Sequence, residues 1–248
     1  MKKILDVSKL KKIYHTNKEE IFALKDINFD VFQGEFISIV GPSGCGKSTI
    51  LSILCNLIDK SSGNISLYNG NKIAYMLQND SLLPFMNVLD NCLIGLKVKG
   101  KIKKCDRDYV ISLLKKYGLA DFIYKYPNNL SGGMRQRCAL IRTLAVKPDI
   151  LLLDEAMSSL DYQSRLNIGE DIYKIIKEEK KTAIMVTHDI GEAISMSDRI
   201  IVLSKRPAIV KNIYDIKLEN PSSPINNRKD IIFSKYFDII WRDLNEWL

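Results

Sequence analysis

Six short apolar runs, each bounded by turn-forming residues, predict β-strands along the chain. Several of them are unbroken stretches of Ile, Val and Leu in which apolar and polar positions do not alternate. Such runs are typical of strands buried on both faces, so they indicate a mostly parallel sheet covered by helices. The predicted strands are 36–40, 64–67, 72–77, 150–153, 183–187 and 199–203.

Two segments between these strands carry apolar residues at the three- and four-residue spacing of a helix. Gly118 is well placed to end the first of them. The apolar positions are Val110, Leu113, Leu114 and Tyr117 in the first segment, and Ile168, Ile172, Ile175 and Ile176 in the second.

Within residues 1–205, strand patterns dominate both ends and helical patterns dominate the middle. We therefore predict a discontinuous α/β core, 1–83 and 149–205, with an inserted helical subdomain, 84–148. A single undivided α/β domain is the alternative.

A tail, 206–248, follows, and prolines interrupt it. Its last stretch is amphipathic, which indicates either a helix that covers the chain's own core or a partner-binding or regulatory tail; the apolar face holds Tyr236, Ile240, Leu244 and Trp247.

Composition narrows the classes of protein that fit this pattern. Of 248 residues, 46% are hydrophobic and 27% charged, which is typical of a globular chain and excludes disorder as the main state. The apolar runs fall far short of the roughly 18 residues that a membrane-spanning helix needs. The basic N-terminus has no apolar region, so it does not resemble a secretory signal. The formal charge of +8 fits a solvated surface, but it would also favour binding of a nucleotide, a nucleic acid or an anionic membrane.

The cysteines are five in number, and none forms a CxxC pair. An odd number without that spacing argues against a disulfide framework and against a zinc site. We interpret them as reduced thiols of a cytosolic protein. They are Cys45, Cys55, Cys92, Cys105 and Cys138.

The most informative segment is GPSGCGKST, residues 41–49, between an apolar strand and an apolar helical run. It fits the phosphate-loop pattern G-x-x-x-x-G-K-[ST], in which backbone N–H groups and a helix N-terminus surround phosphate oxygens. Lys47 is expected to reach the β- and γ-phosphates, and the Ser48 hydroxyl to bind Mg²⁺. Cys45 is expected to contribute only its backbone. The other expected nucleotide contacts in the loop are Gly41, Pro42, Ser43, Gly44, Gly46 and Thr49.

Polar residues follow two further apolar strands. Asp154 and Glu155 end the run that begins at Ile150, at the sheet edge where α/β proteins bind ligands. Asp154 is the candidate to hold Mg²⁺, and Glu155 the candidate to orient and deprotonate an attacking water. His188, after the strand 183–187, is the candidate for a γ-phosphate contact.

A third motif, LSGGMRQR at residues 130–137, begins far along the chain, with 83 residues between Lys47 and Ser131. Ser131 is a good N-cap for the helix that follows, and the amides of Gly132 and Gly133 make that helix end a second anion site. Together with the phosphate loop and the acidic strand end, this motif closely resembles the signature of the ABC ATPase family.

The resemblance covers most of the chain and implies a P-loop NTPase (RecA-like) core, a helical signature subdomain and N-terminal antiparallel β elements. It implies ATP and Mg²⁺, and a head-to-tail pair of subunits that sandwich ATP between one phosphate loop and the other signature. Tyr14 stands where the family stacks an aromatic ring on adenine. Gln78 matches the glutamine that touches Mg²⁺ or the attacking water. Residues 158–161, ending in Asp161, match the loop that crosses the dimer interface, while Ala156 replaces a common proline.

The segment 79–92 resembles that of importers for nitrate, sulfonates, taurine or thiamine precursors, and so does 203–210. This likeness implies a peripheral subunit on the cytoplasmic face of the membrane, bound to a separate transmembrane permease and served indirectly by a substrate-binding protein. An exporter or iron–sulfur assembly subunit shares all the motifs and stays open. A soluble ABC ATPase acting on nucleic acid is the more distant alternative, and no nucleic-acid partner is expected.

Overall fold

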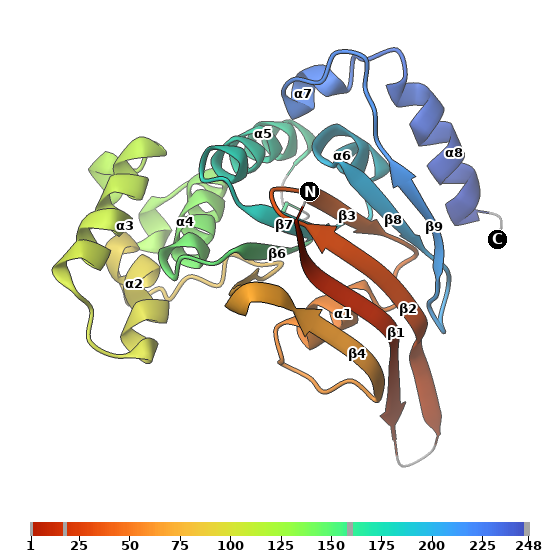
Figure 1. Cartoon of the computed structure of the whole chain (residues 1–248). Helices are drawn as coiled ribbons and strands as arrows, with labels where there is room; N and C mark the ends of the chain where they lie inside the picture. Colours follow the sequence, from red (N-terminus) through yellow and green to blue (C-terminus); the bar gives the residue numbers. More distant parts are fainter. Residues whose placement is uncertain (1, 17–18, 158–160, 246–248) are drawn as a thin grey trace.

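The computed structural model describes residues 2–16, 19–157 and 161–245. Helices α2, α3 and α4 lie at one end of the molecule, the strands at its centre, and α8 at the opposite end (Figure 1). The strands are β1 (Lys3–His15), β2 (Glu20–Phe32), β3 (Phe36–Val40), β4 (Ser62–Leu67), β5 (Ile73–Met76), β6 (Ile150–Asp154), β7 (Thr182–Val186), β8 (Arg199–Leu203) and β9 (Val210–Asp215). The α-helices are α1 (Lys47–Leu54), α2 (Val88–Lys99), α3 (Lys104–Lys116), α4 (Gly132–Ala145), α5 (Tyr162–Glu178), α6 (Ile190–Met196), α7 (Pro224–Asn227) and α8 (Phe233–Asn245), and the 3₁₀ turns are η1 (Tyr68–Gly70), η2 (Ala120–Phe122) and η3 (Pro127–Asn129).

The central sheet has six strands in the order β5-β6-β7-β3-β8-β9, and every pair except the antiparallel β8-β9 is parallel. A second sheet, β2-β1-β4, is antiparallel and forms the expected N-terminal β elements. In the central sheet β6, β7 and β3 are neighbours. The acidic pair after β6, His188 after β7 and the phosphate loop after β3 therefore meet at one sheet edge.

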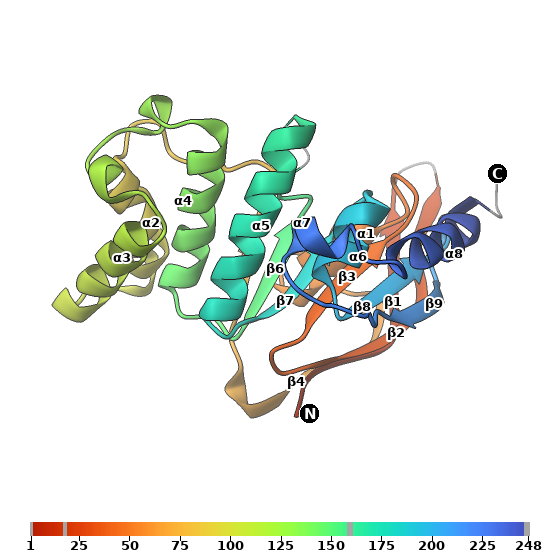
Figure 2. The same cartoon turned by 90° about the horizontal axis from the view of Figure 1, so that it is seen from above.

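The central strands β3, β6, β7 and β8 are buried on both faces, which explains their largely apolar sequences. In β6, Ile150 and Leu152 point into the core shared with α1 and the antiparallel sheet. Leu151 and Leu153 point into the opposite core, shared with α2–α5. Figure 2 shows α4 and α5 side by side along this second face. The prediction of a mostly parallel sheet covered by helices is confirmed.

The six strands predicted from apolar runs are present as β3–β8, with ends shifted by at most two residues. The bounds of β1, β2 and β9 could not be predicted in this way. Both long strands are interrupted by shifts in register. Lys9 and Asp26 take left-handed backbone angles there, with φ of 50° and 59°. Each irregularity changes which face the following side chains occupy, so the alternation along the sequence is lost.

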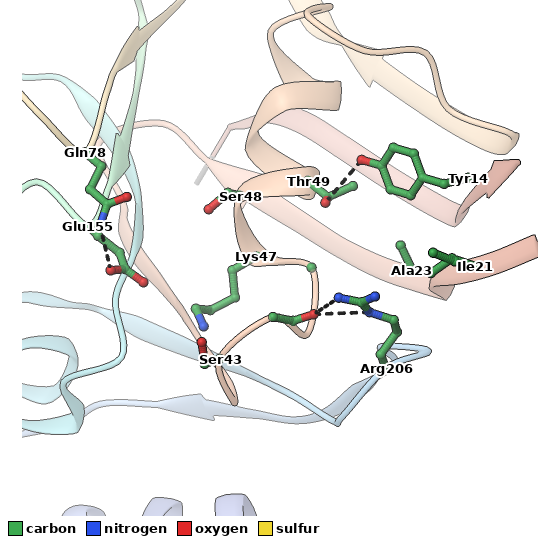
Figure 3. A pocket seen from close by; sticks show the side chains of 12 residues that line it. Tyr14, Ile21, Ala23, Ser43, Lys47, Ser48, Thr49, Gln78, Glu155 and Arg206 are labelled. Carbon is green, nitrogen blue, oxygen red and sulfur yellow. Dashed lines mark hydrogen bonds between the residues drawn. The ribbon is translucent and has the colours of Figure 1, made fainter. Parts of the chain in front are cut away.

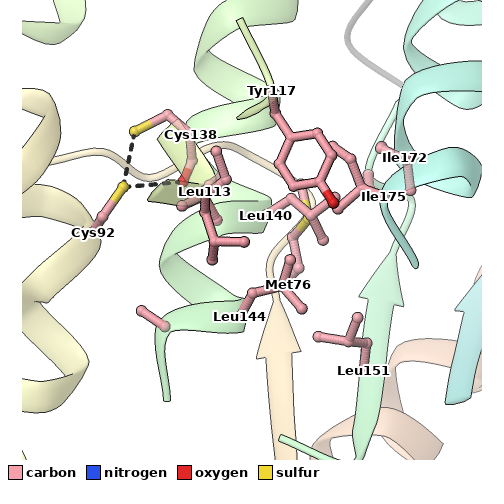
Figure 4. Packing of buried hydrophobic residues seen from close by; sticks show 14 of the residues in the cluster. Met76, Cys92, Leu113, Tyr117, Cys138, Leu140, Leu144, Leu151, Ile172 and Ile175 are labelled. Carbon is pink, nitrogen blue, oxygen red and sulfur yellow. Dashed lines mark hydrogen bonds between the residues drawn. The ribbon is translucent and has the colours of Figure 1, made fainter. Parts of the chain in front are cut away.

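The helices α2, α3 and α4 share an apolar core with α5 and one face of the central sheet (Figure 4). Leu113 and Leu114 of α3 lie in it, as their spacing predicted. Cys92 of α2 and Cys138 of α4 are fully buried there, with their sulfur atoms 3.6 Å apart. Burial raises the pKa of the Cys92 thiol, with a further contribution from the hydrogen bond with Cys138.

The segment after Arg206 adds to the core. The strand β9 joins the edge of the central sheet, and α8 packs on β8 and α6. Ile240 of α8 is fully buried, and Leu244 packs beside it, in agreement with a helix that covers the chain's own core. Trp247 lies outside the described residues. Within the part of the chain that the structure describes, no helix has the length and apolar character needed to cross a bilayer.

Candidate active site

A cavity of about 470 Å³ opens beside the phosphate loop (Figure 3). The first turn of α1 forms one wall, the ends of β5 and β6 another, and the antiparallel sheet a third. Segments far apart in sequence therefore meet around one space. Its lining residues are Tyr14, Ile21, Ala23, Ser43, Gly44, Gly46, Lys47, Ser48, Thr49, Gln78, Glu155 and Arg206.

Lys47 is held over the phosphate loop by the loop itself. Its ammonium donates to the carbonyl oxygens of Gly41 at 2.8 Å and Pro42 at 3.1 Å. The residue is only 6% exposed, so the charge lies at the base of the cavity. Among the described residues its hydrogen-bond acceptors are these two neutral carbonyls, so the buried ammonium is well placed to receive an anion.

The loop needs glycine at two positions. Gly44 and Gly46 have φ of 71° and 119°, in the left-handed region that other residues avoid. A Cβ at Gly46 would also lie 2.8 Å from the Leu24 side chain. Cys45 between them is buried, and burial raises the pKa of its thiol.

Ser48 and Asp154 form the oxygen pair expected for a metal ion. The Ser48 hydroxyl donates to Asp154 Oδ1 at 2.9 Å, and the Tyr75 hydroxyl donates to Oδ2 at 2.6 Å. Burial, and then the bond to Asp154, raises the pKa of Tyr75, which keeps the phenol protonated as a donor. Hydroxyl and carboxylate oxygens are ligands that Mg²⁺ prefers, and a nucleotide's phosphates would supply others. The residues present therefore fit Mg²⁺.

Glu155 lies at the meeting point of three chain segments. Its Oε2 accepts from Gln78 Nε2 at 3.4 Å and lies 3.3 Å from His188 Nδ1. Its backbone takes a φ of 43°, and its N–H donates to the carbonyl of Val186 at 2.9 Å. A left-handed conformation costs a non-glycine residue on the order of 1–3 kcal/mol and is often found at functional sites.

The wall opposite the acidic residues is more apolar. Tyr14, Ile21 and Ala23 of the antiparallel sheet line it, and the Tyr14 hydroxyl lies 3.5 Å from Thr49 Oγ1. The ammonium of Lys12 lies 4.8 Å from the centre of the Tyr14 ring. An aromatic ring beside two aliphatic side chains can hold a flat base.

The sequence predicts Tyr14 at the site, but it does not predict Ile21, Ala23 or Arg206 there. No local pattern marks the first two as site residues. They reach the cavity because β2 pairs with β1 beside the phosphate loop. Neither β1 nor β2 is among the six strands predicted from apolar runs. Arg206 enters from the turn between β8 and β9.

A smaller cavity of about 280 Å³ adjoins the phosphate loop on the side of α8. Gly41, Pro42 and His188 line it, together with Trp241 and Leu244 of α8, and Ser43 lies on both cavities. The structure thus brings His188 beside Glu155, although it does not line the larger cavity.

The signature residues do not line the larger cavity of their own chain. Ser131 caps α4 as predicted, with its hydroxyl accepting from Met134 N at 3.3 Å. Gly132 and Gly133 form the first turn of that helix. Asp161 caps α5 by accepting from Ser164 N at 3.0 Å, and hydrogen bonds with the Ser164 side chain and then its backbone N–H lower the pKa of the Asp161 carboxyl. Residues 158–160 of the predicted interface loop lie outside the described residues.

This geometry agrees with the comparison to known proteins. A sequence profile described as ABC transporter matches residues 24–158, more than half of the chain. The chain belongs to the ABC transporter family. It is an ATP-binding domain of that family and an ATPase.

Relatives cover this ABC ATPase almost from end to end. It is 43% identical to the uncharacterized ABC transporter ATP-binding protein YtlC of Bacillus subtilis (strain 168), over 97% of this chain and 95% of that protein. It is 34% identical to the nitrate import ATP-binding protein NrtD of Synechocystis sp., over 95% of this chain and 93% of that protein. Among solved structures, the dimeric post-hydrolysis state of the ATP-binding cassette MJ0796, bound to ADP and Pi, matches with a TM-score of 0.73 at 33% identity, covering 86% of this chain and 99% of that chain.

Proposed function

We propose that this ATPase powers solute import through a separate transmembrane permease, as a head-to-tail dimer on the cytoplasmic face of the membrane. The supporting observation is the division of the site. One copy gathers the phosphate loop and Glu155 around a single cavity, with His188 beside Glu155, while Ser131 and the start of α4 lie outside it. A second copy would bring its signature helix to this cavity and complete the site.

Each described site residue has a role in this proposal. Lys47 and the loop amides bind the phosphates, and Tyr14 contacts the adenine base. Glu155 orients the attacking water and accepts its proton at a carboxylate oxygen, while Gln78 and His188 fix the position of that carboxylate. Gly132 and Gly133, at the N-terminus of α4, would contact the nucleotide bound by the partner, and Asp161 lies beside the interface. Catalysis is then mostly positioning and charge stabilisation.

Ser48 and Asp154, with Gln78 nearby, are the residues that would hold Mg²⁺. When bound, the ion supplies positive charge to the phosphate oxygens. The hydrogen bond between Ser48 and Asp154 already fixes the direction of both oxygen donors. This preorganisation reduces the cost of ordering the two side chains when metal-nucleotide binds.

A chain of contacts joins the cavity to the signature helix. Asp80 follows Gln78 closely and accepts from Arg135 Nε at 2.9 Å. Arg142 of α4 donates to the carbonyls of Asp80 at 2.6 Å and Ser81 at 2.8 Å. A shift of Gln78 in response to nucleotide would therefore move α4. In the proposal, the helical subdomain 84–148 carries this movement to the permease.

The segment after Gln78 supports a membrane partner. Phe85 is 70% exposed, in the part of the chain whose sequence resembles small-anion importers. Its loop is rigid, because the fully buried Asn91 amide donates to the carbonyls of Leu83, Met86 and Asn87. A large aromatic side chain on a fixed loop is well suited to be a docking anchor. Likeness to NrtD favours a small anion such as nitrate as the solute.

The test is co-purification of the tagged chain with its permease from detergent-solubilised membranes. We expect the wild type to retain a multi-span membrane protein and Phe85→Glu to lose it, with unchanged ATPase activity of the isolated subunit. Phe22→Glu is the matched control, because Phe22 is 49% exposed on the distant strand β2. If no multi-span protein accompanies the wild type, or if Phe85→Glu retains it fully, the permease proposal is wrong.

A further inference from the structure

The turn between β8 and β9, residues 204–208, is fastened to the wall of the cavity. The N–H of Ala208 donates to the carbonyl of Ala23 at 3.0 Å, and the N–H of Lys25 donates to the carbonyl of Ala208 at 2.8 Å. Ala208 is fully buried, and Ser204 is buried at the other end of the turn. The backbone of this turn is therefore held in a fixed position relative to β2.

Arg206 extends from this turn to the phosphate loop (Figure 3). Its Nη2 and Nε donate to the carbonyl oxygen of Gly44 at 2.7 and 3.2 Å. The same peptide unit is held from its other side, since the N–H of Cys45 donates to the carbonyl of Pro42 at 3.2 Å. The peptide between Gly44 and Cys45 is thus fixed at both ends.

Fixing this peptide matters because the loop binds through its backbone. A phosphate loop works only when consecutive N–H groups keep one shared orientation, and Gly44 has the left-handed angle that sets the turn. Without an anchor, a glycine-rich loop has many other conformations available. A guanidinium with two donors on one carbonyl restricts both the position and the rotation of that peptide.

We propose that Arg206 is a positioning residue for nucleotide phosphates: it holds the Gly44 carbonyl and so keeps the phosphate loop in its binding conformation. This inference rests on the proposed use of this cavity for nucleotide. Arg206 also adds a second cation to Lys47, against the single carboxylate of Glu155, among the residues that line the cavity. The turn connects the base-contacting strand β2 to the phosphate loop, so the two ends of the nucleotide are held at a fixed spacing.

The experiment measures Mg-ADP and Mg-ATP binding to the purified full chain by calorimetry. We expect Arg206→Ala to weaken both by about tenfold or more, the size expected for a hydrogen bond to a charged group. Arg206→Lys recovers part of the loss, because an ammonium can donate to Gly44 but cannot restrict the peptide with two nitrogens. The KM for ATP rises in Arg206→Ala, while kcat at saturating ATP changes little. The control Arg107→Ala removes an exposed arginine of α3 and leaves binding unchanged.

Two results overturn the inference. In the first, wild type binds nucleotide and Arg206→Ala binds it equally well. In the second, Arg206→Ala and Arg206→Lys lose binding equally, and the melting temperature of the nucleotide-free protein falls in parallel, as a purely structural role would require. If the wild type itself binds no nucleotide, the proposed function of the cavity fails and not the role of Arg206 alone.

Discussion

Glu155 shows how backbone and chemistry are joined at a single residue. The left-handed φ turns the chain sharply at the end of β6, and the bond from its N–H to Val186 stabilises that turn. The carboxylate is thereby directed to the cavity, between Gln78 and His188. Asp154, one residue earlier, points to Ser48 instead. In the proposed mechanism these two adjacent acids would have different roles, Asp154 toward the metal ion and Glu155 toward the attacking water.

Replacing Glu155 with Gln separates these roles. We expect Glu155→Gln to slow phosphate release by about 10²–10⁴-fold, the usual contribution of a general base. ATP binding remains, because glutamine keeps the shape and removes a negative charge near the phosphates. ATP should then stabilise a dimer that gel filtration can detect. Asp121→Asn, at an exposed acid of η2, is the control. Hydrolysis by Glu155→Gln at the wild-type rate would rule out the base role.

Glu192 makes the stability of the fold depend on pH. Its carboxylate is buried and accepts from the Thr187 hydroxyl at 2.7 Å. Burial, with a smaller contribution from Asp189, raises its pKa above the ordinary 4.5. The folded chain therefore binds this proton more tightly than the unfolded chain, and stability from this group is lost as pH rises through the raised pKa.

The variant Glu192→Gln removes this titration and can still accept from Thr187. We expect its free energy of unfolding, relative to wild type, to increase as pH rises from 4.5 toward neutrality. Urea unfolding at several pH values measures this difference. A difference that stays constant over that range would mean that Glu192 does not carry the effect.

At the level of elements, the sequence predicts what local pattern determines. The strands β3 and β6–β8 are recognisable because each buries both faces and so consists mostly of apolar residues, with Ser38 as the polar residue inside β3. The phosphate loop is also recognisable from the sequence, because its function depends on residues that are adjacent in the chain. Arg206 could not be predicted in this way, since 162 positions separate it from Gly44. Its contact depends on how β9 and the turn before it join β2, which no short segment encodes.

The helix α8 tests whether the core extends to the last described helix of the chain, which packs on β8 and α6. We expect Ile240→Ala to lower the free energy of unfolding by about 2–5 kcal/mol, because the side chain is fully buried and leaves a cavity. Its neighbour Ile239 is 45% exposed, so Ile239→Ala should change stability by less than about 0.5 kcal/mol. Urea unfolding of the full chain compares the two. Equal effects would mean that α8 does not pack on the core as described.

For the whole molecule, the separation of Lys47 from Ser131 is the decisive feature. Lys47 is buried at the base of the cavity, while Ser131 caps a helix that does not reach it. Each copy would then contribute its phosphate loop to one composite site and its signature helix to a second composite site. A defect in one half-site should be correctable by an intact half-site from another copy. This property distinguishes a shared site from a site that is complete within one chain.

Mixing two inactive variants tests that property directly. Lys47→Ala removes the phosphate contact, and Ser131→Arg blocks the signature helix, so each should hydrolyse ATP poorly alone. In an equal mixture half of the dimers are mixed, and each has one intact composite site, so activity should return to roughly a quarter of wild type. Phosphate release before and after mixing measures it, with Lys47→Ala mixed with itself as control. Full activity of Ser131→Arg alone would show that one copy completes its own site.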